Sequence, residues 1–442
     1  MSEKEYIVTL NKGVDYAQFN QEMISSTGGG DIPNRTVDVA DKRELSTRNT
    51  HYALTEAEAE SLRNDNRVTD VQLRPQDRDD IEIGHDAVQT ANFNKSSSDS
   101  GDYRDWGKIT HSFKENKYGT STSLGGDFSR PYSMDGTGVD VVIQDSGLQV
   151  DHPEFFDANG NTRMQLIDWY AASGVTGSQS SNHYRDYDGH GTHCGGTATG
   201  LNFGWASNAR VYSVKVGGLE GSGDSGGISI SSCFDVIKGW HQNKPIDPKT
   251  GYKRPTIVNA SWGYSGSIGG SFSNITSYVY RGVTYNSSTP GWSSSTSYHR
   301  DTYGFYPYYR FPSYRYPVRI ASVDADVEDC VDAGVHICIA AGNNSFKIAD
   351  STDPDYDNII FWTSSNNYYH RGSSPFDTGA IIVGAMDMTP ENATTEQKTS
   401  FSSTGPGVDI FSAGENIISC TSTQTRFGNT PYFGNSSFKQ TN

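Results

Sequence analysis

The stretch at residues 187–198, which reads YDGHGTHCGGTA, constrains the fold more than any other part of the chain. Glycines bracket His190 and small residues follow it, a pattern typical of a strand giving way to a tightly packed helix. A histidine at such a junction can offer one ring nitrogen to a neighbour while a carboxylate holds the other. We therefore expect His190 to lie at a strand–helix junction.

Two apolar runs, one on each side of this stretch, predict buried strands. Residues 139–144 lead to Asp145, and residues 335–341 lead to Asn343. Aspartate, then histidine, then asparagine, each at a strand end in an α/β pattern, is the chain order found in subtilisin. At these residues the chain resembles the subtilisin-like serine proteases, and Cys194 matches the cysteine of their proteinase K branch.

The resemblance implies a serine endopeptidase with an α/β fold, in which helices flank a mostly parallel sheet. Asp145 is then the aspartate of an Asp-His-Ser triad, His190 is its general base, and the Asn343 side chain donates to the oxyanion. No cofactor is implied. Residues 201–208 lack the insertion that carries the strong calcium site of many subtilisins, so we expect no metal there.

The same resemblance assigns a substrate channel, whose residues are Gly221, Ser222, Gly223, Ser261, Trp262, Gly263, Ala341 and Gly342. The first three match the family's extended segment that pairs with the substrate backbone, where glycine leaves room for the peptide. The next three match its Ser-Leu-Gly segment, with tryptophan in place of leucine, which should narrow or flatten the pocket it borders. The last two should border the specificity pocket.

The N-terminal residues 1–76 are expected to form a small α+β, ferredoxin-like domain. Residues 5–10 and 67–73 predict strands, and residues 55–58 form a capping box that opens a helix. This unit resembles the subtilase propeptide, which in the family assists folding and inhibits the enzyme by laying its C-terminal tail in the cleft. An unrelated small domain is the alternative.

Residues 77–105 are polar and predict a linker, after which residues 106–442 form the peptidase domain. One part of that domain, residues 264–316, is rich in tyrosine, serine and glycine and does not fit the family core. Two interpretations remain open for this insertion. It is either a binding flap beside the cleft or an insertion packed on its own domain.

The nucleophilic serine is not found in the expected context. In the family it lies in a Gly-Thr-Ser-Met-Ala motif that opens a buried helix. Ser225 lies in Gly-Asp-Ser-Gly-Gly, but its motif belongs to folds that contradict the pattern here. Ser121 precedes Asp145, and Ser436 and Ser437 lack the Gly-Thr context.

We therefore expect the serine just beyond residue 442 or on a second polypeptide. The expected partners are a polypeptide substrate, the chain's own prodomain in the cleft, and a C-terminal fragment carrying the serine. The alternative function is a catalytically inactive subtilase-fold structural or binding protein, such as one of a phage particle.

Charge and composition argue against several classes of partner and structural site. The formal net charge of −17 argues against nucleic acid and anionic membranes as partners. Five cysteines without a C-x-x-C motif provide neither a disulfide framework nor a zinc site. No apolar segment has the length of a signal peptide or a membrane span, so we expect a cytoplasmic or virion-associated protein.

Overall fold

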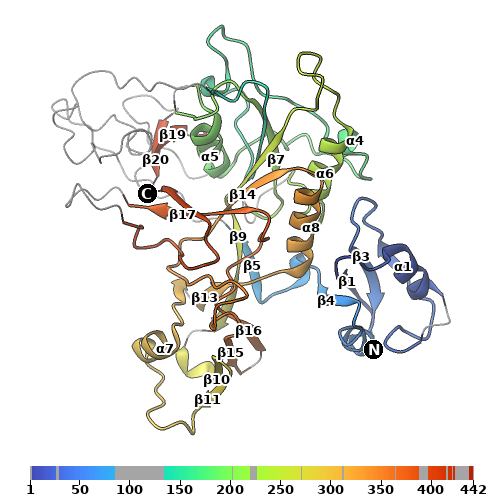
Figure 1. Cartoon of the computed structure of the whole chain (residues 1–442), viewed down its shortest axis with the longest axis vertical. Helices are drawn as coiled ribbons and strands as arrows, with labels where there is room; N and C mark the ends of the chain where they lie inside the picture. The colour runs from blue at the N-terminus through green and yellow to red at the C-terminus, as the bar shows by residue number, and fades with distance from the viewer. Residues whose placement is uncertain are drawn as a thin grey trace, which may run out of the picture.

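A computed structural model describes most of the chain, namely residues 2–25, 29–84, 134–201, 203–219, 226–269, 271–310, 313–363, 365–387, 397–414, 417–420, 422–423 and 438–441. In Figure 1, an N-terminal unit lies to the right of the main body, and a smaller module that contains α7 lies below it. A search of the helices in this described part of the chain finds none that is long and apolar enough to span a membrane.

The main sheet has parallel strands in the order β18-β17-β14-β8-β6-β7. Its strands are β6 (Asp140–Asp145), β7 (Arg210–Lys215), β8 (Thr256–Ala260), β14 (His336–Ala340), β17 (Ile381–Met386) and β18 (Ile410–Ala413). Every residue of β6 is buried, as expected for a central parallel strand covered on both faces. This sheet confirms the predicted α/β fold.

Helices cover both faces of the main sheet, and they are α4 (Trp169–Ser173), α5 (His190–Thr199), α6 (Ile230–Asn243) and α8 (Ala321–Asp332). On one face, α6 and α8 pack with Val142, Val258 and Ile337 in a large core. On the other face, α5 and the turn η3 (Pro153–Phe155) cover β6. Against α5 lies β19 (Ile417–Cys420), which pairs with β20 (Phe438–Thr441).

Within the described part of the chain, no helix covers the α5 side of the sheet over β14, β17 and β18. Cys338 lies beside Ile381 in the register, and Val383 lies beside Ile410, so all four side chains point to this side. Ile381 is 44% exposed and Ile410 is 56% exposed, whereas Ile382, which points to the other side, is buried. We call this surface the open face, and it consists of Cys338, Ala340, Ile381, Val383, Ala385 and Ile410.

The N-terminal unit has its own antiparallel sheet, in the order β2-β3-β1-β4. Its elements are β1 (Lys4–Leu10), α1 (Tyr16–Ile24), β2 (Val39–Asp41), β3 (Asn49–Leu54), α2 (Glu56–Leu62) and β4 (Val68–Leu73). Phe19, Tyr52 and Leu62 belong to a core that is separate from that of the main body. Thr55 and Glu58 form the predicted capping box at the start of α2.

Regular structure continues into the segment whose composition predicted a linker. After η1 (Pro75–Asp77), residues 81–84 form β5 (Ile81–Gly84), which pairs antiparallel with β9 (Gly263–Gly269) of the main body. Polarity did not reveal this strand because its pairing partner is distant in the sequence. The rest of the expected linker and the start of the expected peptidase domain lie outside the described residues.

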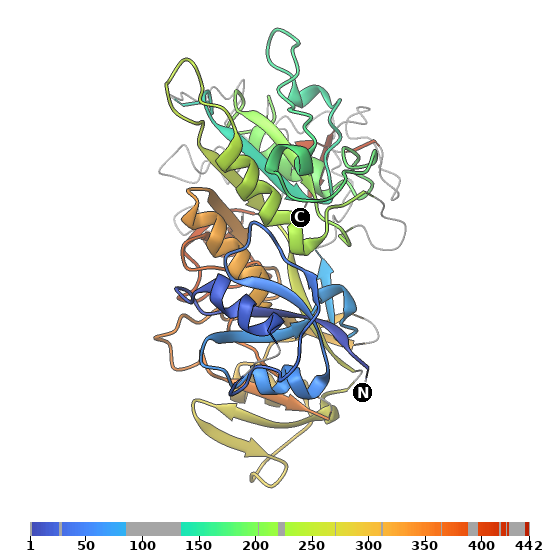
Figure 2. The same cartoon turned by 90° about the vertical axis from the view of Figure 1, so that its right-hand side faces the viewer.

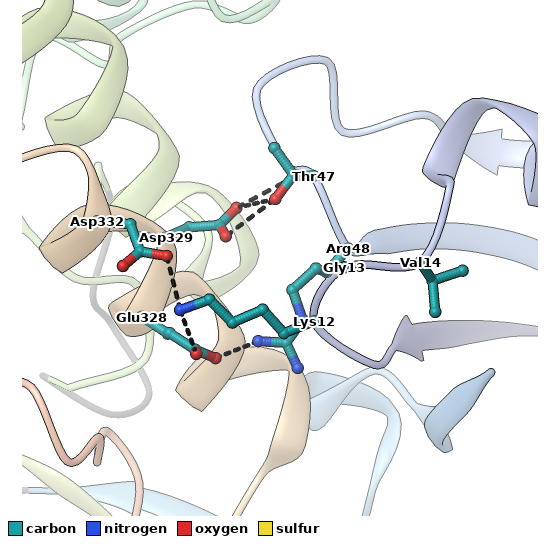
Figure 3. A pocket seen from close by; sticks show the side chains of 8 residues that line it. All are labelled: Lys12, Gly13, Val14, Thr47, Arg48, Glu328, Asp329 and Asp332. Atoms are coloured by element: carbon teal, nitrogen blue, oxygen red, sulfur yellow. Dashed lines mark hydrogen bonds and ion pairs between the residues drawn. The ribbon is translucent and has the colours of Figure 1, made fainter. Parts of the chain in front are cut away.

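The N-terminal unit docks on the α6–α8 surface through complementary charges. Figures 1 and 2 both show it beside α8. In Figure 3, Lys12 Nζ lies 3.0 Å from Glu328 and 2.9 Å from Asp332, and Thr47 Oγ1 donates to Asp329 at 3.0 Å. The unit contributes the cation of these ion pairs and the main body contributes the carboxylates.

The tyrosine-rich insertion is folded over most of its length. Its elements, with the later strands that pair with them, are β9, η4 (Phe272–Asn274), β10 (Ile275–Tyr280), β11 (Val283–Asn286), α7 (Thr296–Tyr303), β12 (Tyr308–Arg310), β13 (Ser313–Pro317), β15 (Ile359–Trp362) and β16 (Ser365–Tyr368). Tyr278 stacks on Tyr303 with 4.3 Å between ring centroids, and Tyr278, Tyr303 and Tyr316 are fully buried. These tyrosines belong to the large apolar core of the main body, which fits a packed insertion better than an open flap.

Candidate active site

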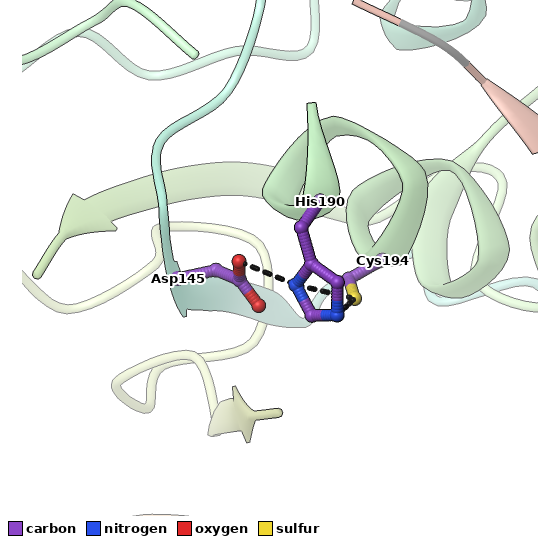
Figure 4. A group of neighbouring side chains, drawn as sticks. All are labelled: Asp145, His190 and Cys194. Atoms are coloured by element: carbon purple, nitrogen blue, oxygen red, sulfur yellow. Dashed lines mark hydrogen bonds and ion pairs between the residues drawn. The ribbon is translucent and has the colours of Figure 1, made fainter. Parts of the chain in front are cut away.

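Asp145 and His190 meet where β6 ends and α5 begins. His190 Nδ1 lies 2.8 Å from Asp145 Oδ1 (Figure 4). The Asp145 carboxylate is fully buried and also accepts the Ser146 amide at 2.7 Å, whereas the His190 side chain keeps 15% exposure. A buried, oriented carboxylate beside a partly exposed imidazole is the arrangement of a general base held in one tautomer.

Glycine allows this close junction. Gly189, the N-cap residue of α5, has a φ of +98°, which lets the chain turn sharply into the helix. Gly147, two residues after Asp145, has a φ of +122°, and a Cβ there would lie 2.3 Å from the Arg185 carbonyl oxygen. The glycine pattern predicted a strand–helix junction, and these glycines are needed because the backbone segments at the junction lie close together.

Cys194 lies one helical turn beyond His190. Its Sγ is 3.7 Å from Nδ1 and 3.9 Å from Nε2 of the imidazole (Figure 4). The metal-binding atoms of Asp145, His190 and Cys194 all lie within 4.8 Å of one another. Burial raises the pKa of the Cys194 thiol well above its usual range.

The predicted residues from the other strands lie along the same edge of the sheet. Parallel β6, β8 and β14 end side by side, which places Ser261 after β8 and Asn343 after β14 on the edge that carries Asp145. Asn343 is exposed, Gly342 has a φ of +92°, and the Ala341 amide donates to the Val383 carbonyl at 2.9 Å.

The predicted substrate segment at Gly263 already carries an extended strand. In the pairing of β5 with β9, Gly84 lies opposite Gly263 and Ile83 opposite Tyr264. A Cβ added to Gly218 would lie 3.1 Å from Ile83 Cγ2. Segment 81–84 therefore pairs with β9 and also lies close to Gly218. The predicted residues Gly221, Ser222 and Gly223 follow shortly afterwards and lie outside the described residues.

Trp262 belongs to the core. It is 3% exposed, its ring packs near Phe234 and Tyr264, and its Nε1 donates to Gln144 Oε1 at 3.2 Å. Its neighbour Ser261 accepts a hydrogen bond from Asn259 at 2.9 Å. The Trp262 ring therefore packs in the core, and little of its surface is left to border the predicted substrate channel.

Sequence reasoning missed Asp186, which is fully buried four residues before His190. The sequence signal that could have revealed it is an acidic residue shortly before a glycine N-cap, where no side chain can cap the helix. The candidate serines Ser121, Ser225, Ser436 and Ser437 all lie outside the described residues.

Comparison with known proteins relates the whole main body to one family. The sequence model of the subtilase family matches residues 136–441. A subtilisin-like serine protease of Cochliobolus lunatus is 29% identical over 65% of this chain and 39% of its own length. Proteinase R of Parengyodontium album is 26% identical over 68% of this chain and 51% of its own length.

Among solved structures, fervidolysin from Fervidobacterium pennivorans is 14% identical with a TM-score of 0.48, over 99% of this chain and 52% of that one. A cold-adapted subtilisin-like serine proteinase is 20% identical with a TM-score of 0.41, over 76% of this chain and 77% of that one. The matched region spans between about two fifths and one half of the two curated relatives. On the match of the family model, the chain belongs to the subtilase family.

Proposed function

We propose that this chain forms most of a serine endopeptidase that hydrolyses peptide bonds by acyl transfer. The observation that carries the proposal is the 2.8 Å contact between His190 Nδ1 and Asp145 Oδ1. His190 accepts the proton of the attacking serine through Nε2 and returns it to the leaving amine. Asp145 holds the tautomer and stabilises the imidazolium.

The Asn343 side chain is assigned to the oxyanion. Its exposed position after β14, on the edge that carries Asp145, supports this role. In subtilisin, removal of the asparagine donor costs about 10²–10³ in kcat. Ala341 and Gly342, immediately before it, border the pocket for the side chain that precedes the cleaved bond.

The serine comes from a helix that docks on the open face. Parallel sheets are normally covered on both faces, yet Ile381 and Ile410 are 44% and 56% exposed. An amphipathic helix on β14, β17 and β18 would bury these side chains and bring its first residues to the edge that carries His190. That helix belongs either to the chain beyond residue 442 or to a second polypeptide.

The substrate is a polypeptide that binds in extended form beside β9. The pairing of β5 with β9 supports this, because strand addition is a common mode of peptide recognition. The N-terminal unit is then a propeptide whose tail occupies the substrate channel. Its removal, or displacement of residues 81–84, would open the channel.

The decisive experiment is labelling with a fluorophosphonate probe, combined with intact mass and peptide mapping of the protein purified from its source. We expect the probe on a serine outside residues 1–442, and we expect His190→Gln to abolish labelling. His241→Gln is the matched control, since His241 bonds Thr256 at the far end of the sheet. A folded, unlabelled species with the mass of this chain alone would overturn the proposal and leave a catalytically inactive scaffold.

A further inference from the structure

The helix that carries His190 begins without a cap of its own. Its N-cap residue is Gly189, which has no side chain to accept hydrogen bonds from the first turn. The first backbone N–H groups of a helix have no intrahelical partner and are costly when buried. At this buried junction another group has to satisfy them.

Asp186 supplies that group from the loop before the helix. Its Oδ1 accepts the Gly189 amide at 2.7 Å, and its Oδ2 accepts the Thr192 amide at 2.8 Å and the Thr192 hydroxyl at 2.5 Å. The carboxylate therefore caps α5 from three residues upstream of the N-cap. A negative charge at this place also interacts favourably with the helix dipole.

The same carboxylate reaches the strand that carries Asp145. Ser146 Oγ donates to Asp186 Oδ1 at 3.0 Å and accepts the Gly191 amide at 2.9 Å. Because Ser146 also donates its amide to Asp145, a continuous network joins the Asp145 carboxylate to the first turn of α5. The two segments it joins are 45 residues apart in the chain.

Burial changes the pKa of ionisable groups in and beside this network. Asp186 is fully buried, and burial raises the pKa of its carboxyl group, while the hydrogen bonds from Thr192 and Gly189 oppose that rise. Close by, Lys215 Nζ donates to the Arg185 carbonyl at 2.9 Å. Cys194, which lies beside His190 together with Asp145, has a pKa raised well above its usual range by burial.

We propose that Asp186 is a positioning residue that locks the His190 imidazole onto Asp145. It does so by fixing the first turn of α5 to the end of β6 through Ser146 and Thr192. The inference rests on the proposed function, because a locked imidazole matters only where His190 acts as a base.

The test is nuclear magnetic resonance of the chain labelled with ¹⁵N-histidine, which reports the Nδ1–H signal of His190. Asp186→Asn removes the charge and leaves only one of two oxygens to accept hydrogen bonds. We expect the Nδ1–H signal to weaken, because the first turn of α5 is no longer held firmly to the end of β6.

Asp168→Asn is the matched control. Asp168 caps α4 by accepting the Tyr170 and Ala171 amides at 3.0 and 3.1 Å, so it has the same kind of role on another helix. This variant should leave the Nδ1–H signal of His190 unchanged.

A second variant covers the case in which Asp186→Asn does not fold. Ser146→Ala cuts the link between the two segments but keeps the Asp186 carboxylate, so we again expect a weaker Nδ1–H signal of His190. A variant of either kind that folds with this signal unchanged would show Asp186 to be merely structural. This readout needs no serine, so an inactive chain would refute the proposed function without deciding the role of Asp186.

Discussion

At the scale of the residue, glycine positions determine how closely β6 and α5 approach each other at the site. Gly191 is the second residue of α5 and faces the end of β6. A Cβ there would lie 2.0 Å from the Gly147 carbonyl oxygen and 3.1 Å from Asp145 Cβ. Strand end and helix start therefore approach to a distance that only glycine permits at this position.

Gly191→Ala should destabilise the protein although alanine is the better helix former. Overpacking costs about 1–3 kcal/mol, against a gain in helix propensity of about 1 kcal/mol. If the helix moves by about 1 Å, labelling by a fluorophosphonate should slow by about 100-fold. Thermal unfolding and the labelling rate measure the two effects.

Gly29→Ala serves as the control, because nothing lies within 4 Å of a Cβ added to Gly29. Its stability should change by no more than about 0.5 kcal/mol. A Gly191→Ala protein with unchanged stability and labelling rate would contradict the close approach.

At the scale of the element, the main sheet is covered asymmetrically. The face below α6 and α8 is closed by a large apolar core, whereas the open face exposes apolar side chains from β14, β17 and β18. Contiguous exposed apolar surface usually marks an interaction site. The elements that would cover it are not among the described residues.

The pair of substitutions Ile381→Lys and Ile410→Lys tests this face. Because both side chains are already exposed, the chain should fold with a stability change near the ±0.5 kcal/mol range of surface positions. Charges on the face should block docking of the proposed serine-bearing helix and lower fluorophosphonate labelling at least about tenfold. Labelling and co-purification of the serine-bearing segment are the measurements.

Ile246→Lys is the matched control, since Ile246 is 59% exposed in the segment that follows α6. It should leave labelling unchanged. Full labelling of the doubly substituted protein would rule out docking on the open face.

At the scale of the whole molecule, the N-terminal unit and the main body are joined by a buried ion cluster. Arg43 of the unit is 4% exposed, and its guanidinium lies 2.8 Å from Asp235 of α6 and 2.9 Å from Asp326 of α8. Burial raises the pKa of Asp326, and the guanidinium opposes that rise. The cluster thus depends on all three groups.

Arg43→Ala should weaken docking by about 3–5 kcal/mol, because it leaves two carboxylates buried without their cation. Burial then holds the pKa of Asp326 above its unfolded value, so the protonated form is favoured in the docked state. By linkage, the deficit should be greatest at alkaline pH and should shrink as the pH falls toward 5. Limited proteolysis between the two parts at pH 5 and pH 8 measures docking.

Lys12→Ala at the rim of the same interface is the control. Its side chain is 61% exposed, so solvent screens its ion pairs and its loss should weaken docking far less than the loss of Arg43. Equal effects of the two substitutions, or a deficit in Arg43→Ala that grows with acid, would contradict this description of the interface.

The sequence alone determined three central elements of the main body and the pair of residues at the centre of the site, Asp145 and His190. Apolar runs placed β6 and β14, and the glycine pattern around His190 placed the start of α5. These features depend on neighbours within a few residues, which periodicity and turn chemistry report directly. The chain order of Asp145, His190 and Asn343 then suggested a family, and the family model matches residues 136–441.

Only the tertiary structure decided how distant segments meet. The pairing of residues 81–84 with β9, the bridge of Asp186 to Ser146, and the exposure of Ile410 each depend on partners tens or hundreds of residues away. Composition made residues 77–105 a linker because the alternation at Ile81, Glu82 and Ile83 is too short to stand out in a polar segment. Which surface stays open and which carboxylate is buried is set by long-range packing, and local patterns do not encode it.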